Sequence, residues 1–98
     1  MGDFRAALEA ALGRPATDDE VAMAYRLGHP AGRLLRRRIG PVPQSQYPDA
    51  AVALAVVRIV ARVVEAGGGV VEVTDDDLRW LAQAAAMMRP PHPFTLGY

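Results

Sequence analysis

The residues best suited to chemistry are arginines on a short segment that follows Pro30. Arg33, Arg36 and Arg37 recur at spacings of three and four between residues 31 and 39, which places them on one side of a helix. Guanidinium groups on one face can bind phosphates through paired hydrogen bonds. DNA base edges are read by Asn, Gln, Ser or Thr beside Arg, and residues 31–39 contain none of these four. The segment therefore suits phosphate contacts, or else it is a solvated helix face.

A helix-turn-helix is the corresponding DNA-binding hypothesis. Ala24 stands four residues before a turn glycine, Gly28, and Leu27 directly precedes that glycine, which suits two closely crossing helices. His29 and Arg37 depart from the pattern, because apolar residues are usual at both positions. A transcriptional regulator that places residues 31–39 in the major groove, with nucleic acid as its partner, is the alternative function.

Catalysis and metal binding have little support in the sequence. Asp75, Asp76 and Asp77 are consecutive, so on a helix their side chains point about 100° apart and cannot converge on one ion. Helix capping explains these aspartates better. His29 and His92 each precede a proline in a turn, without a nucleophile and an orienting group nearby in sequence. We therefore expect no metal site, no cofactor and no enzymatic activity.

A second candidate surface is apolar and lies toward the C-terminus. On the helix predicted over 75–89, Trp80, Ala84 and Met87 share a face roughly opposite to the main apolar face. Trp and Met are typical of adaptable protein interfaces, although in a small domain the same side chains also suit the core. The expected partner-binding residues are Trp80, Ala84, Met87, Phe94, Leu96 and Tyr98.

Length and composition limit the alternatives. Ninety-eight residues with 51% hydrophobic content suit one helical domain spanning 1–98, whose proline-rich tail at 90–98 we expect to be docked. The formal net charge is zero, so nothing global favours nucleic acid or an anionic membrane. The chain has no cysteine, which excludes disulfides, thiol catalysis and cysteine metal sites. The N-terminus lacks a basic segment leading into an apolar run, which indicates a cytoplasmic protein or part of an intracellularly assembled particle.

The periodicity predicts an all-α bundle of four main helices, over 3–12, 18–27, 49–66 and 75–89, plus a short helix over 31–39. Thr17 and Glu20 form a predicted capping box, and Thr74 is the predicted N-cap of the last helix. We expect Pro30 to separate 18–27 from 31–39.

The valine-rich helix over 49–66 is the predicted centre of the bundle. It is apolar on almost every side except for a narrow strip of Arg58, Arg62 and Glu65. The two arginines argue against a membrane span. Residues 70–73 suit a short β segment, and 40–48 an extended connector.

Arg38 falls on the apolar side of its helix, so it must snorkel, meet a carboxylate or face a partner.

The apolar surface exceeds what a monomer of this size can readily bury. The leading hypothesis is therefore a non-enzymatic protein-interaction or assembly module, oligomeric or part of a larger complex, with another protein or itself as partner. By size and class alone, small helical adaptors, phage-type connectors and regulators that sequester a partner suit this description.

Overall fold

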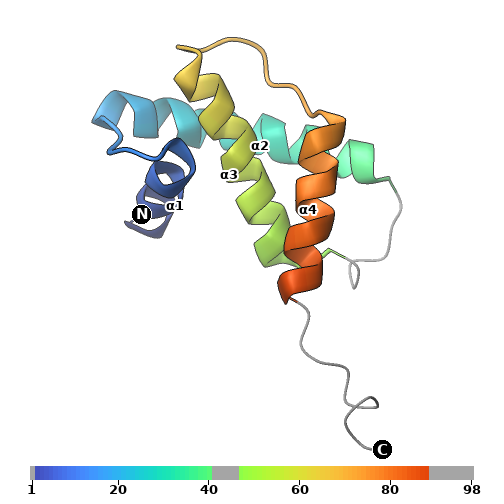
Figure 1. The fold of residues 1–98 in the computed structure, drawn as a ribbon. Coiled ribbons are helices and arrows are strands. Elements are labelled where there is room, and N and C mark those ends of the chain that lie inside the picture. Colours follow the sequence, from blue (N-terminus) through green and yellow to red (C-terminus); the bar gives the residue numbers. More distant parts are fainter. Residues whose placement is uncertain (1, 41–46, 89–98) are drawn as a thin grey trace, which may run out of the picture.

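The computed structural model describes residues 2–40 and 47–88 (Figure 1). Within these ranges the chain is all-α, with helices α1 (Gly2–Leu12), α2 (Asp18–Ile39), α3 (Asp49–Glu65) and α4 (Asp75–Met88). The helices predicted over 3–12 and 49–66 are confirmed, and the one predicted over 75–89 is present as far as Met88. No helix in the described ranges combines the length and hydropathy of a membrane span.

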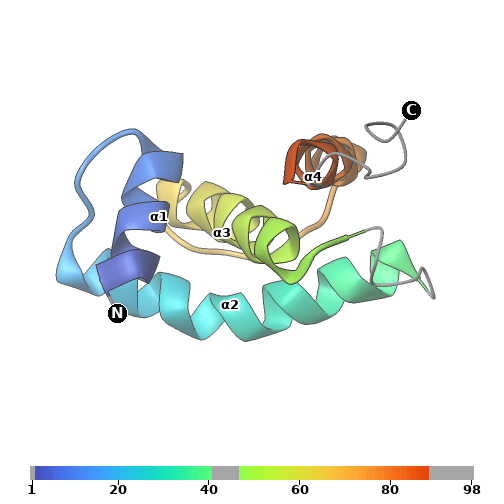
Figure 2. The same ribbon diagram turned by 90° about the horizontal axis from the view of Figure 1, so that it is seen from below.

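Helix α3 lies at the centre of the molecule and contacts each of the other three helices. Figure 2 shows α2 alone on one side, with α1, α3 and α4 on the other and α3 between α1 and α4. Nine residues of α3 are buried, which agrees with the valine-rich centre expected from the sequence. Leu8, Leu35, Ile59 and Leu81, one from each helix, are fully buried together in this core.

The predicted break at Pro30 is wrong, because α2 continues from Asp18 to Ile39 with Pro30 inside it. The separate short helix over 31–39 therefore does not exist. Proline removes one backbone hydrogen bond and crowds the preceding turn, a cost of about 3 kcal/mol in a helix interior. The apolar period nevertheless runs on through Ala24, Ala31 and Leu35, which are fully buried, whereas Pro30 is exposed. The burial of α2 residues on both sides of Pro30 thus outweighs the cost of a proline inside the helix.

Residues 70–73 form no strand, so the β segment suggested by their valines is not observed. Two backbone carbonyls of this loop instead accept hydrogen bonds from arginines. Arg62 Nη2 donates to Glu72 O at 2.8 Å, and Arg38 Nη1 donates to Val73 O at 2.7 Å. Arg38, the arginine on the apolar side of its helix, also reaches a carboxylate, with Nη2 2.9 Å from an oxygen of Asp75. Arginine side chains of α2 and α3 therefore hold this loop.

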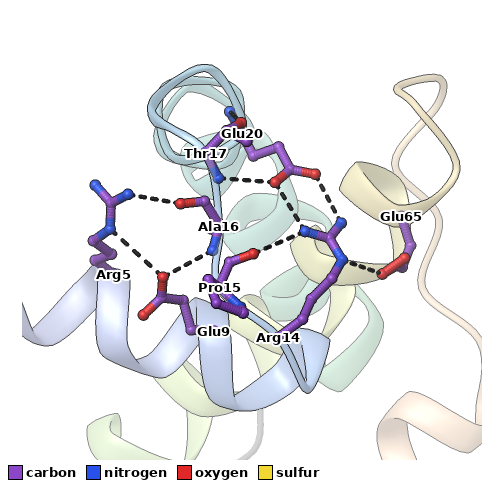
Figure 3. A network of polar contacts seen from close by, with 8 residues as sticks. All are labelled: Arg5, Glu9, Arg14, Pro15, Ala16, Thr17, Glu20 and Glu65. Atoms are coloured by element: carbon purple, nitrogen blue, oxygen red, sulfur yellow. Dashed lines mark hydrogen bonds and ion pairs between the residues drawn. The ribbon is translucent and has the colours of Figure 1, made fainter.

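A polar network joins the turn between α1 and α2 to the end of α3 (Figure 3). The predicted capping box is confirmed: Glu20 N–H donates to Thr17 Oγ1 at 3.1 Å, and Thr17 N–H donates to Glu20 Oε1 at 2.9 Å. Arg14 donates to both carboxylate oxygens of Glu20, at 3.0 and 2.8 Å, and its Nε donates to Glu65 at 3.3 Å. The hydrogen bonds from Arg14 lower the pKa of Glu20 to about 2.

Candidate protein-binding groove

An apolar groove of about 580 Å³ runs along the side of α3 that faces away from α2. Its floor comes from α3, one wall from α1 and the other from Trp80 of α4, in keeping with the positions of α1 and α4 on either side of α3 (Figure 2). The lining residues are Ala7, Ala10, Ala11, Leu12, Leu54, Val57, Arg58, Ala61, Arg62, Glu65 and Trp80.

Helical periodicity explains which α3 side chains form the floor. Leu54, Val57 and Ala61 stand at i, i+3 and i+7, so they share one side of the helix, and Arg58 and Arg62 follow one position further on. The polar strip expected on the surface of this helix therefore runs along the groove. Leu54 keeps 39% of its surface exposed there.

The wall from α1 is made of small side chains. Ala7, Ala10 and Ala11 line the groove, and Leu8 on the neighbouring side of the helix is fully buried in the core. Alanines let another backbone approach closely, so this wall can accept a helix as well as a single side chain.

A buried aspartate fixes the opposite wall. Asp77 is fully buried at the start of α4, where its two oxygens accept hydrogen bonds from Nη1 and Nη2 of Arg62, both at 2.8 Å. Asp77 Oδ2 also accepts from the Thr74 N–H at 2.8 Å, and Thr74 Oγ1 accepts from the Asp77 N–H at 3.3 Å. Thr74 is therefore the N-cap, as predicted, and the cluster joins the first turn of α4 to α3.

The electrostatics of this cluster follow from its contacts. Burial alone would raise the pKa of Asp77, but the hydrogen bonds from Arg62 and Thr74 outweigh burial, so the pKa lies below its ordinary value. The hydrogen bonds with Asp77 raise the pKa of Arg62. Asp77 is thus a buried anion held by an arginine pair rather than a group ready to transfer protons.

Arg58 connects the cluster to Trp80. Its Nε lies 3.7 Å from Asp77 Oδ1, and its guanidinium carbon lies 5.5 Å from the centre of the Trp80 ring. A guanidinium at this distance from an indole face makes a cation–π contact. Since Arg62 takes the paired hydrogen bonds with Asp77, Arg58 is the cation with the looser carboxylate contact in the groove.

The three consecutive aspartates each pair with a different arginine. Asp75 pairs with Arg38 at 2.9 Å, Asp76 with Arg79 at 2.9 Å and Asp77 with Arg62. This divergence is what their helical spacing predicted. In the described part of the chain, no three His, Cys, Asp or Glu side chains could hold a metal ion together.

The predicted partner-binding residues have different surroundings. Trp80 is half-buried, lining the groove and also packing against the core; Ala84 is half-buried, and Met87 is 86% exposed. Phe94, Leu96 and Tyr98, together with the docked tail predicted at 90–98, lie outside the described residues.

The predicted nucleic-acid residues lie on α2, away from the groove. Arg33, Arg36 and Arg37 are all exposed. The turn that a helix-turn-helix needs at Gly28 is not formed, because Gly28 lies inside the continuous α2. That structural prediction is wrong, since packing of α2 against α3 continues past the proline.

The sequence reasoning missed the α1 wall and the role of Leu54. The sequence pattern shows that these residues are apolar, but which apolar residues stay uncovered depends on how many helices surround α3. The buried state of Asp77 was missed too. Two signals could have found it: arginines four residues apart on an otherwise apolar helix, and an acid at the capping-box position after Thr74.

Comparison of the chain with protein-family models, with curated proteins and with solved structures finds no significant match.

Proposed function

We propose that this chain is a non-enzymatic protein-interaction module whose groove binds an amphipathic helix from a partner protein or from a second copy. The observation that supports it is the apolar groove on the uncovered side of the most apolar helix. Binding of a helix in an apolar groove is a recurrent mode of protein recognition.

The arrangement of the helices gives the argument its geometry. Helix α3 has α2 on one side and α1 and α4 flanking it, and the groove lies on the remaining side (Figure 2). A helix laid against Leu54, Val57 and Ala61 would cover that side as α2 covers the other. The axes of packed helices lie about 8–10 Å apart, and they approach most closely where the contacting side chains are small. The alanines of the α1 wall are such side chains.

The groove also indicates the chemistry of the partner. Its helix should present apolar residues at i, i+3 or i+4, and i+7 to the floor, and an acidic residue near Arg58, whose contact with Asp77 is the looser of the two arginine contacts. Met87 stands seven residues, almost two full turns, after Trp80, so the apolar face of α4 extends past the groove wall. Small adaptors, connectors of assembled particles and sequestering regulators would use such a surface. The cytoplasmic location expected from the sequence belongs to the same proposal.

The test is binding of a helix to the groove and its loss when the floor is changed. A library of amphipathic helical peptides displayed on phage is selected against the purified chain, and self-association is measured by light scattering over a concentration series. Leu54→Glu places a charge on the floor. Ala86→Glu is the matched control, because Ala86 is exposed and lies about 120° around α4 from Trp80.

We expect Leu54→Glu to weaken the affinity for the selected peptides, or the self-association of the chain, at least tenfold. Ala86→Glu should leave both unchanged. Equal weakening by both variants, or a monomer that selects no peptide from the library, would refute the groove as the binding site. Circular dichroism of both variants establishes that they fold.

A further inference from the structure

The arginines of this protein fall into two groups. Among the described residues, those outside the outward face of α2 each have a carboxylate partner within 4 Å: Arg5, Arg14, Arg38, Arg58, Arg62 and Arg79. Four arginines of α2, namely Arg26, Arg33, Arg36 and Arg37, form no such pair in residues 2–40 and 47–88.

The rest of the sequence supplies no acidic side chain for these four. All eleven Asp and Glu residues lie inside the described ranges, and residues 41–46 and 89–98 contain neither. The zero net charge of the chain thus hides a segregation: acidic side chains pair with the other described arginines, including Arg38 of α2, and leave the four on the outward face of α2 without a side-chain counter-ion.

The continuity of α2 makes the four arginines a single row. Arg26, Arg33 and Arg37 stand at i, i+7 and i+11, almost in line along the helix, and Arg36 flanks them. At 1.5 Å per residue, the row is about 16 Å long from Arg26 to Arg37. A turn at Gly28 would have separated Arg26 from the others, so this row exists only because the helix runs through Pro30.

The row is unobstructed. All four arginines are exposed, and the opposite side of α2, with Ala24 and Leu35, is buried. Figure 2 shows no other helix on the outer side of α2. A long rod-like partner could therefore lie against α2 without meeting the rest of the molecule.

The neighbours of the row indicate which polyanion it suits. Ala22, His29 and Pro30 accompany the arginines on this side of α2, and none is a large apolar side chain that would insert into a membrane or anchor a protein interface. Tyr25 lies on the same side of α2 as Arg36 and is 58% exposed, but its ring packs edge-on against Phe4 of α1, with the ring centres 5.3 Å apart. Binding of nucleic-acid backbone needs no such anchor, because counterion release on phosphate neutralisation supplies the free energy.

We propose that the outward face of α2 binds the phosphate backbone of double-stranded nucleic acid through Arg26, Arg33, Arg36 and Arg37, without preference for base sequence. The absence of Asn, Gln, Ser and Thr from the row favours backbone contacts over base reading. This binding needs no helix-turn-helix and does not depend on the groove of the proposed function.

The experiment is fluorescence anisotropy of a labelled 20-base-pair duplex of random sequence, titrated with the full chain between 20 and 200 mM NaCl. Four phosphate contacts predict a slope of log affinity against log salt near −3.6, which is about a 150-fold loss between 50 and 200 mM. Arg33→Gln removes one contact, so the slope should become shallower by about one.

Arg79→Gln is the matched control, because Arg79 is 73% exposed but lies on α4 and pairs with Asp76. We expect it to leave the slope unchanged, and the quadruple α2 variant to abolish binding at 20 mM NaCl. Leu54→Glu, the groove variant, should bind the duplex as the unmodified chain does, which separates this proposal from the proposed function.

Three results would overturn the proposal. The first is no binding of the duplex at 20 mM NaCl. The second is an equal effect of Arg33→Gln and Arg79→Gln. The third is tighter binding, at the same salt concentration, to a polyglutamate peptide or to vesicles of phosphatidylserine and phosphatidylcholine, which would assign the row to an acidic protein or a membrane surface.

Discussion

Helices α2 and α4 begin with almost the same four residues, Thr-Asp-Asp-Glu at 17–20 and Thr-Asp-Asp-Asp at 74–77. Both starts form the same reciprocal cap, in which the threonine hydroxyl accepts from the fourth residue and that residue's carboxylate accepts from the threonine N–H. Both carboxylates are also held by two nitrogens of one arginine.

The two starts differ in what lies beyond the cap. Glu20 meets Arg14 in the surface turn between α1 and α2 and keeps 22% of its side chain exposed, whereas Asp77 meets Arg62 of α3 and is fully buried. The same local motif is therefore a surface cap in one place and a tertiary anchor in the other. The free energy at stake differs because water can replace a lost partner only at the surface.

The strongest test of this contrast is Asp77→Ala. It would leave the Thr74 N–H and the facing side of Arg62 without an acceptor, and removing one partner of a buried pair costs about 3–5 kcal/mol. Because Arg62 is itself partly exposed, we expect a loss of about 2–4 kcal/mol in the free energy of unfolding. Urea denaturation measures it.

Asp76→Ala is the control for that variant, since Asp76 lies on the same turn but is exposed and pairs with Arg79. Its expected change is within about 0.5 kcal/mol. If Asp76→Ala and Asp77→Ala destabilised the protein equally, the anchor role of Asp77 would be wrong.

Replacing the threonines tests whether the two caps are locally alike. Thr17→Ala and Thr74→Ala each remove one side-chain hydrogen bond to the backbone, for which we expect losses of about 1 kcal/mol. The Thr17 bond is the shorter, at 3.1 Å against 3.3 Å for Thr74. Thermal and urea unfolding of both variants would measure these losses. If Thr74→Ala lowered the free energy of unfolding as much as Asp77→Ala, the cap and the tertiary anchor at the start of α4 would not be separate contributions.

The smallest expected effect is the acid titration of Glu20. Its pKa is lowered from 4.5 to about 2, chiefly by Arg14. A depressed folded-state pKa contributes stability that is present above the ordinary pKa and is lost as the pH falls toward the folded one. The contribution of Glu20 should therefore decline between pH 4.5 and about 2.

Glu20→Gln keeps a capping acceptor but removes the charge. We expect the stability difference between this variant and the unmodified chain to shrink across that pH range, as followed by urea midpoints and by the NMR shift of the Glu20 carboxyl carbon. A difference that stays constant with pH would show that the Arg14 pair does not lower the pKa.

Much of the secondary structure could be predicted because its signals are local. The Thr17 and Thr74 caps depend on residues within one turn, and the stop after α3 depends on Gly67, whose φ of 82° suits glycine. The break at Pro30 could not be judged in this way. Its outcome depended on whether burial of Ala24, Ala31 and Leu35 against α3 outweighed one lost hydrogen bond.

The candidate sites show the same division. Trp80 could be singled out from its type and spacing, but its place on a groove wall required α1 and α4 to flank α3 (Figure 2). The α2 arginines were visible in the sequence, except that Arg26 joined them only once the helix was continuous.

By itself, the sequence determined where most helices start and stop and which side of each is apolar, because caps, glycines and the 3.6-residue period act within a few residues. Only the tertiary structure decided which side of α3 stays uncovered, which of two similar acidic caps is buried, and which arginines find a carboxylate. Those outcomes depend on contacts between residues far apart in the chain, and their free energies depend on the exclusion of water, which no local pattern encodes.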